Sequence, residues 1–231
     1  MTHEKTKATV SGINLNRPHW LCHNVKQVAI LCRDRSPSMS GAKAEDASAA
    51  SCELVEELAQ PVNKDGFYVG IVDFAVSAQV IHTLEKATAL NKNLSPLQVV
   101  NTDAEAGTNI TAALENALQL LKKPPKLAPS EANDQFLRPV IILLSDGCHN
   151  RKPHPRAVAE KIKKQADLVT VAFGNDADET LLAELATTPQ HLYRCQDGRQ
   201  LRSFLAAVGA TMTATMAAGT AATTALTAVK T

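Results

Sequence analysis

The sequence has almost no excess of charge of either sign, because 24 lysines and arginines stand against 23 aspartates and glutamates. A formal net charge of +1 gives no long-range field that would draw nucleic acid or an anionic membrane to the protein. Lysines gather at 122–126 and 161–164, but no aromatic residue is interleaved with them. We interpret both clusters as solvated helix faces and ends, and we expect no nucleic-acid and no membrane partner.

Long apolar runs are also missing. No stretch approaches the roughly 20 apolar residues that a membrane-spanning helix needs. Residues 1–16 are polar and lack the apolar centre of a secretion signal. These absences predict a cytoplasmic protein, and 231 residues with 45% hydrophobic content suffice for one sizeable core.

Cysteine is too sparse and too widely spaced for a disulfide framework. The five cysteines are an odd number, which favours reduced thiols. We predict that Cys32, Cys52 and Cys195 are small buried hydrophobic residues.

His19, Cys22 and His23 lie close together near the N-terminus. A zinc site needs a fourth ligand, and the sequence offers no companion cluster. We therefore favour a packed N-terminal segment anchored by Trp20 over a zinc site.

Oxygen-bearing side chains follow the first apolar run of the chain. Asp34, Ser36 and Ser38 place one carboxylate and two hydroxyls at alternate positions where a buried strand should end. A small divalent ion such as Mg2+ takes oxygen ligands, and one short loop cannot hold it alone. Thr108 and Asp146 stand at the starts of two later loops, which a parallel sheet would return to the same edge. Together these residues outline a hard-cation site.

These residues resemble the metal-ion-dependent adhesion site (MIDAS) of von Willebrand factor A (VWA) domains. The resemblance covers roughly residues 25–208 and rests on Asp-x-Ser-x-Ser after a strand, Gly-Thr before a helix, and Ser-Asp-Gly after a later strand. Pro37 stands where many members have glycine, which removes one backbone N–H but no metal ligand. Within the family, the layout is most similar to bacterial tellurium-resistance (TerY-like) VWA proteins.

The resemblance implies how a metal would be held. Ser36 and Ser38 would bind Mg2+ directly, with Mn2+ or Ca2+ as alternatives, and Asp34 and Asp146 would bind it directly or through water. Thr108 is the variable ligand in the family, where its exchange accompanies a shift between low- and high-affinity states. Two carboxylates neutralise a dication and leave an open position, so the implied ligand is an Asp or Glu of a partner protein.

Other residues near this edge have simpler interpretations. Arg151 and Lys152 either pair with an acidic partner surface or are merely solvated. His149 is interpreted as an ordinary surface histidine, although a pH sensor is the alternative. Asp73 is interpreted as a hydrogen-bonded rim residue in preference to a sixth metal ligand.

The coarse pattern alternates strands with helices. The predicted strands are 25–32, 67–74, 78–84, 140–145, 168–173 and 192–195. The predicted helices are 42–58, 110–121, 158–165, 179–186 and a last one beginning at 200. The link between the second and third strands is so short that this pair must be antiparallel. We predict an α/β fold: a doubly wound, mainly parallel six-stranded sheet with one antiparallel edge strand and helices on both faces.

Three segments are predicted along the chain. They are an N-terminal arm at 1–24, a VWA domain at 25–208 and an Ala/Thr-rich tail at 209–231. The tail is either a continued helix or a partly ordered appendage, because Ala favours helix and Thr opposes it mildly.

Three classes of function fit these observations. The leading one is a metal-dependent protein-interaction module. For TerY-like proteins the resemblance implies a bacterial stress-resistance or phage-defence system, with a protein kinase and a PP2C-type phosphatase as partners.

The second class is a Mg2+-dependent enzyme such as a phosphotransferase. A phosphoaspartate enzyme would need a second Asp where Ser36 stands, and neither a Walker lysine motif nor a Gly-x-Gly-x-x-Gly loop after a strand is present. We therefore expect no enzymatic activity. The third class is an assembly protein that no longer uses its metal, and the intact ligand set argues against it.

Overall fold

The computed structural model describes residues 25–100, 106–123, 125–131 and 134–230. The strands are β1 (Val25–Asp34), β2 (Phe67–Phe74), β3 (Ala78–Lys86), β4 (Gln135–Phe136), β5 (Val140–Ser145), β6 (Asp167–Phe173) and β7 (Leu192–Cys195). The helices are α1 (Ala42–Leu58), α2 (Ala87–Leu90), α3 (Ile110–Leu121), α4 (Arg156–Lys163), α5 (Glu179–Leu185), α6 (Gly198–Ala218) and α7 (Thr223–Leu226). The predicted arm, with His19, Cys22 and His23, lies outside the described residues.

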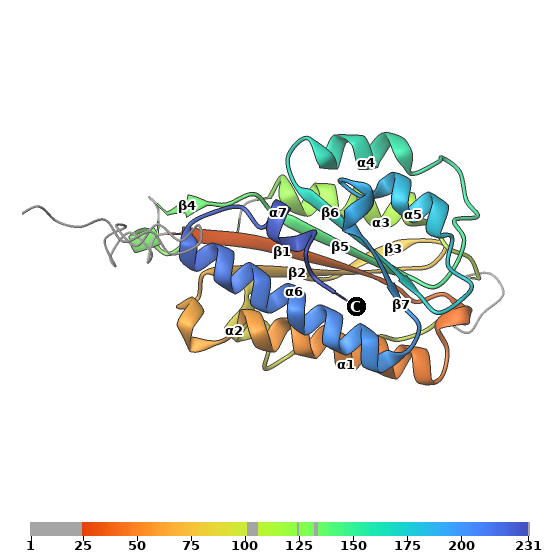
Figure 1. The fold of residues 1–231 in the computed structure, drawn as a ribbon, viewed down its shortest axis with the longest axis horizontal. Coiled ribbons are helices and arrows are strands. Elements are labelled where there is room, and N and C mark those ends of the chain that lie inside the picture. Colours follow the sequence, from red (N-terminus) through yellow and green to blue (C-terminus); the bar gives the residue numbers. More distant parts are fainter. Residues whose placement is uncertain (1–24, 101–105, 124, 132–133, 231) are drawn as a thin grey trace, which may run out of the picture.

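One sheet forms the centre of the molecule, with strand order β3-β2-β1-β5-β6-β7 (Figure 1). Its pairings are parallel except for β2 with the edge strand β3, which confirms the predicted fold class. The prediction of six strands is wrong by one, because β4 pairs in parallel with the first two residues of β1. This strand is two residues long and exposed, so no apolar pattern marks it in the sequence.

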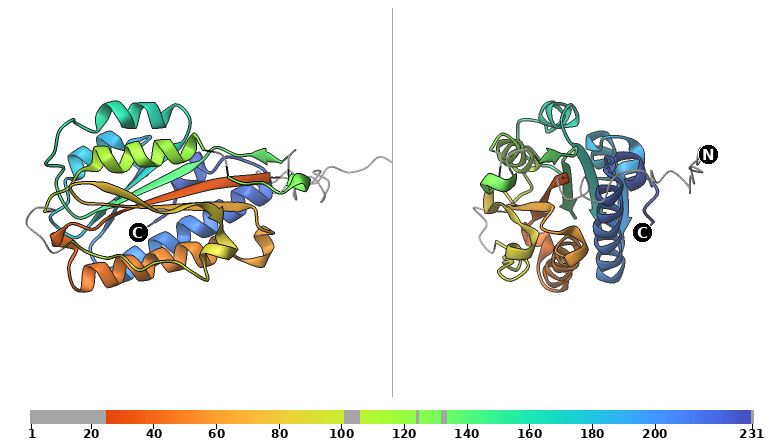
Figure 2. Two further views of the ribbon diagram at one scale, coloured as in Figure 1. Left: turned by 180° about the vertical axis from the view of Figure 1, so that it is seen from behind. Right: turned by 90° about the vertical axis from the view of Figure 1, so that its left-hand side faces the viewer.

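Helices cover both faces of the sheet (Figure 2). The helices α1, α2 and α6 enclose one core with alternate β1 residues such as Ala29 and Leu31. The helices α3, α4 and α5 enclose the other core with Ile30 and Cys32. Because β1 lies between two cores, all ten of its residues are buried. This explains why residues 28–32 in the middle of β1 read as a continuous apolar run and not as an alternation.

The last long helix passes through the predicted boundary between domain and tail. Asp197 caps the start of α6, where its carboxylate accepts a hydrogen bond from the Gln200 N–H at 2.9 Å. The helix ends at Gly219, whose φ of +65° is left-handed. Met212 and Met216 are buried in the core shared with α1. Residues 209–218 are therefore a continued helix, one of the two predicted alternatives.

Gly209 allows α6 to approach α1 closely. A Cβ at Gly209 would lie 2.6 Å from Glu57 Cβ. A change of rotamer does not move a Cβ atom, so the two helix backbones would have to separate. Alanine favours a helix over glycine by about 1 kcal/mol, whereas overpacking a core costs roughly 1–3 kcal/mol. We expect the second effect to prevail, so that Gly209→Ala destabilises the fold by about 1 kcal/mol.

Urea unfolding checks this expectation, with the exposed Ala210→Gly as a measure of helix propensity alone. Ala210→Gly should lower the free energy of unfolding by about 1 kcal/mol. A Gly209→Ala variant more stable than the wild type would show that α6 and α1 are not in close contact there.

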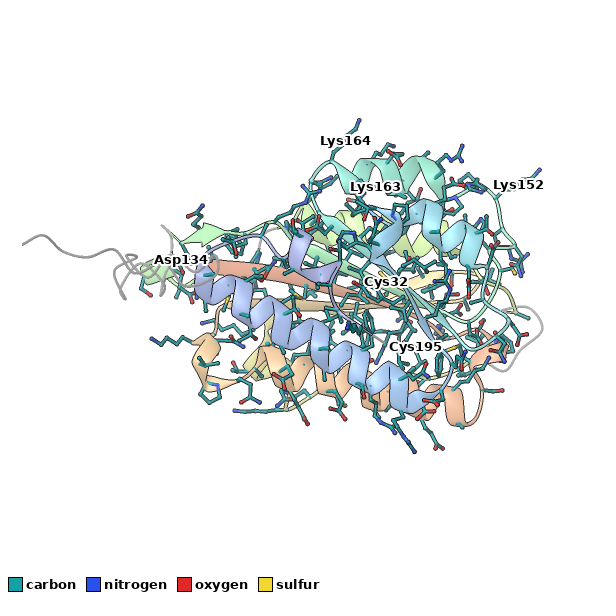
Figure 3. The ribbon with its side chains drawn as sticks, in the orientation of Figure 1. Cys32, Asp134, Lys152, Lys163, Lys164 and Cys195 are labelled. Atoms are coloured by element: carbon teal, nitrogen blue, oxygen red, sulfur yellow. The ribbon has the colours of Figure 1, made fainter. Side chains whose placement is uncertain are left out.

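Burial separates the cysteines. Cys32 and Cys195 lie inside the molecule (Figure 3), as predicted, and burial raises the pKa of the Cys195 thiol to about 12. The prediction for Cys52 is wrong, because its residue is exposed. The buried face of α1 runs through Ala47, Ser51 and Val55, and Cys52 is turned about 100° away from Ser51.

The lysines of the two predicted clusters are exposed except for Lys163. Only 18% of the Lys163 side chain is exposed, because it pairs with Glu160 and donates a hydrogen bond to the Glu184 carbonyl at 2.8 Å. Lys164, after α4, and Lys152, in the loop before it, project into solvent (Figure 3). No helix in the described ranges has the length and apolar content needed to cross a bilayer.

Candidate metal centre

The candidate site lies at the carboxyl ends of β1 and β5, which are neighbours in the sheet. From β1 the chain first adds β2 and β3 on one side, and later β5, β6 and β7 on the other (Figure 1). The junction between β1 and β5 is therefore the switch point at which ligands bind in doubly wound sheets. Asp34 is the last residue of β1, and Asp146 directly follows β5.

Hydrogen bonds join the two aspartates through the serines. Asp34 Oδ1 accepts from the Ser36 N–H at 2.9 Å, and its Oδ2 accepts from the Ser145 hydroxyl at 2.6 Å. The Ser36 and Ser38 hydroxyls are 3.0 Å apart. Ser38 Oγ donates to Asp146 Oδ1 at 2.8 Å. Four of the five predicted site residues thus form one connected cluster.

The first loop is shaped by a turn that its sequence favours. The Asp34 side chain holds the backbone N–H two residues ahead, as Asp commonly does in turns. Pro37 opens a single 3-10 turn, Pro37–Met39, at a position where a missing N–H loses no hydrogen bond within the turn. Met39 is completely buried and anchors the loop. The proline in place of glycine is therefore compatible with the site.

Thr108 reaches the cluster from the start of α3. Its N–H donates to Asn150 Oδ1 at 3.1 Å, and the Asn150 N–H donates to the Thr108 carbonyl at 3.1 Å. A Cβ on Gly147 would lie 3.2 Å from Thr108 Oγ1 and 3.8 Å from Ser38 Oγ. The threonine hydroxyl thus lies on the same side of the β5 loop as the serines, and all five predicted residues are brought together.

Two carboxylates are enclosed in this site. Asp34 and Asp146 have no exposed surface, whereas Ser38 is exposed. Burial raises the pKa of the Asp34 carboxyl to about 6; hydrogen bonds from Ser145 and Ser36 oppose this shift, and the charge of Asp146 adds to it. A cation would relieve the cost of ionising Asp34.

The donor set is suited to a hard cation. Every side-chain ligand it offers is a carboxylate or hydroxyl oxygen, which is the chemistry of Mg2+, Mn2+ and Ca2+ sites. Among the described residues, no three His, Cys, Asp or Glu side chains converge on one point. The site therefore depends on hydroxyl ligands to supplement its two carboxylates.

Two neighbouring residues differ from their sequence interpretations. Asp73 is hydrogen-bonded as predicted, since its carboxylate accepts two hydrogen bonds from Arg33 at 2.7 and 2.9 Å, but it is buried and does not lie on the rim. His149 is partly buried, and its Nδ1 accepts a hydrogen bond from the Ile110 N–H at 3.2 Å. Burial lowers its pKa, and the neighbouring His154 contributes to this shift. His149 thus supports the start of α3 and is not a simple surface histidine.

Sequence reasoning missed three polar residues of the site. Ser145 was predicted only as the end of a strand, although it is the serine of the Ser-Asp-Gly motif. Asn150 was predicted only as a loop residue. Lys43, in the first turn of α1, contacts Asp146 Oδ2 through its ammonium nitrogen at 2.5 Å. No local signal in the sequence indicates that contact, because the partners are 103 positions apart.

Comparison with known families agrees with the fold. The family model described as the von Willebrand factor type A domain matches residues 29–207. The chain therefore belongs to the von Willebrand factor type A domain family. A search of curated protein sequences found no significant match.

Several solved structures share the fold at low sequence identity. The vWF domain of the type V pili tip protein Mfa5 from Porphyromonas gingivalis has a TM-score of 0.65 and 13% identity, covering 84% of this chain and 97% of that chain. A von Willebrand factor type A protein from Catenulispora acidiphila has a TM-score of 0.64 and 16% identity, covering 82% and 43%.

Proximal thread matrix protein 1 from the mussel byssus, solved with a zinc-occupied MIDAS motif, has a TM-score of 0.62 and 18% identity. The match covers 83% of this chain and 46% of the mussel chain. This chain thus spans less than half the length of the mussel and Catenulispora proteins. Identities this low establish a common fold alone.

Proposed function

We propose that this chain is a metal-dependent protein-interaction module. Asp34, Ser36, Ser38, Thr108 and Asp146 would hold the divalent cation, with Mg2+ as the first candidate and Mn2+ or Ca2+ as alternatives. The observation that carries the proposal is the cluster in which two buried carboxylates meet three hydroxyls at the switch point of the sheet. A dication bound there would supply an open coordination position for a carboxylate. The zinc-occupied MIDAS of the mussel protein supports occupancy by a divalent metal.

The partner would contribute an Asp or Glu side chain. Ser38 is exposed, so the cluster has a side that a partner can approach. Arg151 and Lys152 are also exposed, on the loop that follows Asp146. Arg151 lies against the loop that carries Thr108, since it donates a hydrogen bond to the Ala106 carbonyl at 2.8 Å. Two basic side chains on the rim favour an acidic partner surface by long-range attraction.

The proposed setting is a cytoplasmic bacterial stress-resistance or phage-defence system of the tellurium-resistance type. It rests on the resemblance of the Asp-x-Ser-Pro-Ser loop and the chain layout to TerY-like proteins. A protein kinase and a PP2C-type phosphatase are the partners proposed for such a system.

A pull-down from the cytoplasm of the source cell tests the module, run in Mg2+ and again in EDTA. We expect Asp34→Ala and Asp146→Ala to abolish metal-dependent retention of the partner, because each removes one of two carboxylates that hold the cation. Asp176→Ala is the matched control, since Asp176 is an exposed carboxylate after the neighbouring strand β6. It should retain the partner as the wild type does.

Two further measurements make the pull-down decisive. Circular dichroism should show that both site variants remain folded, and calorimetric titration should show Mg2+ binding by the wild type and the control alone. If the same proteins are retained in EDTA, or by folded Asp34→Ala and Asp146→Ala variants, the interaction does not pass through this site.

A further inference from the structure

Lys43 contacts the candidate metal centre from the first turn of α1. Its ammonium nitrogen is 2.5 Å from Asp146 Oδ2, while Asp146 Oδ1 accepts the hydrogen bond from Ser38. Both oxygens of this carboxylate are therefore engaged. The Asp146 side chain is completely buried, whereas 31% of the Lys43 side chain is exposed. The lysine thus closes one side of the site and can still reach solvent.

The position of Lys43 is not one that helix formation favours. A cation in the first turn of a helix opposes the helix dipole, whose positive end is there. The placement of Lys43 is therefore explained by its contact with Asp146 and not by helix preference.

The contact between Lys43 and Asp146 affects the charge that the site can hold. Two buried carboxylates, Asp34 and Asp146, carry a charge of −2 when ionised, and the Lys43 ammonium neutralises one of these charges. A dication bound by the same carboxylates would lie beside a positive ammonium in a partly buried place, where like charges repel strongly. The ammonium and the dication therefore cannot both be bound favourably at Asp146.

We propose that Lys43 is a tethered cation that competes with the divalent metal for Asp146. This inference rests on the proposed function of the site. In the metal-free protein Lys43 holds Asp146 Oδ2 and limits the cost of the buried charge. Metal binding displaces its ammonium toward solvent, where an acidic partner can contact it. Lys43 thereby lowers the affinity for the metal and sets the concentration at which the site becomes loaded.

Titration with Mn2+ tests the competition, with free Mn2+ followed by electron paramagnetic resonance. Lys43→Gln should bind Mn2+ about tenfold more tightly than the wild type or better, because a repelling unit charge is removed. Lys43→Arg keeps the charge and should stay close to the wild type. Lys164→Gln removes an exposed lysine after α4, far from the site (Figure 3), and should leave the affinity unchanged.

Displacement has its own readout in the wild-type protein. Labelling by an amine-reactive reagent, measured by mass spectrometry at Lys43, should rise severalfold when saturating Mn2+ replaces EDTA. Labelling at Lys164 serves as the internal reference.

The outcomes separate the two proposals. If the wild type binds Mn2+ but Lys43→Gln binds it no more tightly, or Lys43 labelling does not rise, the competition is disproved and the metal site stands. If neither the wild type nor Lys43→Gln binds Mn2+, both proposals are overturned.

Discussion

Replacing Asp34 with asparagine is expected to stabilise the metal-free protein above pH 6 and to remove its response to Mg2+. The asparagine amide can keep both hydrogen bonds of the wild-type carboxylate. Its oxygen accepts from the Ser36 N–H, and its NH2 group donates to the Ser145 hydroxyl, which in the wild type donates to Asp34. It cannot supply the negative charge that a dication requires. One substitution thus separates the stability of the site from its function, and residues at functional sites often show such a trade-off.

The sign of the effect follows from the pKa of Asp34. Its folded-state pKa of about 6 lies above the roughly 3.9 of an unfolded chain, so the folded protein takes up the proton first as the pH falls. In EDTA the contribution of Asp34 to the stability of the wild type, measured against Asp34→Asn, should therefore grow between pH 6 and pH 4, and below that window it is complete. The expected growth is on the order of 1–3 kcal/mol. Asp34→Asn lacks this contribution, and above pH 6 it should be more stable than the wild type by a similar amount.

Thermal unfolding in EDTA and in Mg2+ at several pH values measures both effects. At 100 times the dissociation constant, Mg2+ should stabilise the wild type by about 2.7 kcal/mol and Asp34→Asn by nothing measurable. Asp176→Asn, an exposed residue after β6, should behave as the wild type does. A full Mg2+ response in Asp34→Asn would remove Asp34 from the metal site.

Asp73→Ala is expected to produce the largest loss of stability, about 3–5 kcal/mol, because it leaves a buried guanidinium without its carboxylate. Arg33 and Asp73 are opposite each other in the register of β1 and β2. Two hydrogen bonds of 2.7 and 2.9 Å join them, and a third donor of Arg33 reaches the Ser95 carbonyl at 3.1 Å. Both side chains are almost completely buried, with exposures of 0% and 4%.

Urea unfolding measures this loss of stability, and two further variants serve as comparisons for Asp73→Ala. Glu179→Ala breaks the exposed ion pair with Arg194 and should cost no more than about 1 kcal/mol. The double variant Arg33→Met, Asp73→Leu removes both charges and should recover most of the loss, since apolar residues of similar volume can replace a buried pair. An Asp73→Ala variant only as unstable as Glu179→Ala would mean that water reaches Arg33.

The sequence by itself determined the strands that carry the candidate site and the order along the chain of its candidate ligands. The middle of β1 and most of β5 read as continuous apolar runs, because both faces of a central parallel strand are covered. The alternation of strands with helices predicted the doubly wound sheet, and such a sheet places Asp34 and Asp146 at one edge. The apolar runs and the alternation of strands with helices depend on residues that are close together in the sequence, so they can be predicted without coordinates.

Only the tertiary structure decided the pairings between distant residues. The strand β4 exists because its two residues pair with β1, and nothing in its own composition requires it. The phase of α1, which turns Cys52 outward, and the continuation of α6 past residue 208 depend on the packing of these two helices. Helix propensity alone is too weak to decide either.

Two ion pairs between distant residues could not be predicted from the sequence either. The Arg33 ion pair with Asp73 spans 40 positions, and the Lys43 contact with Asp146 spans 103. Whether a charged side chain is solvated or paired depends on what the fold brings beside it, because burial without a partner is costly and burial with one is tolerated. The sequence therefore predicted the candidate oxygen ligands, whereas only the fold shows that the Lys43 ammonium lies beside Asp146.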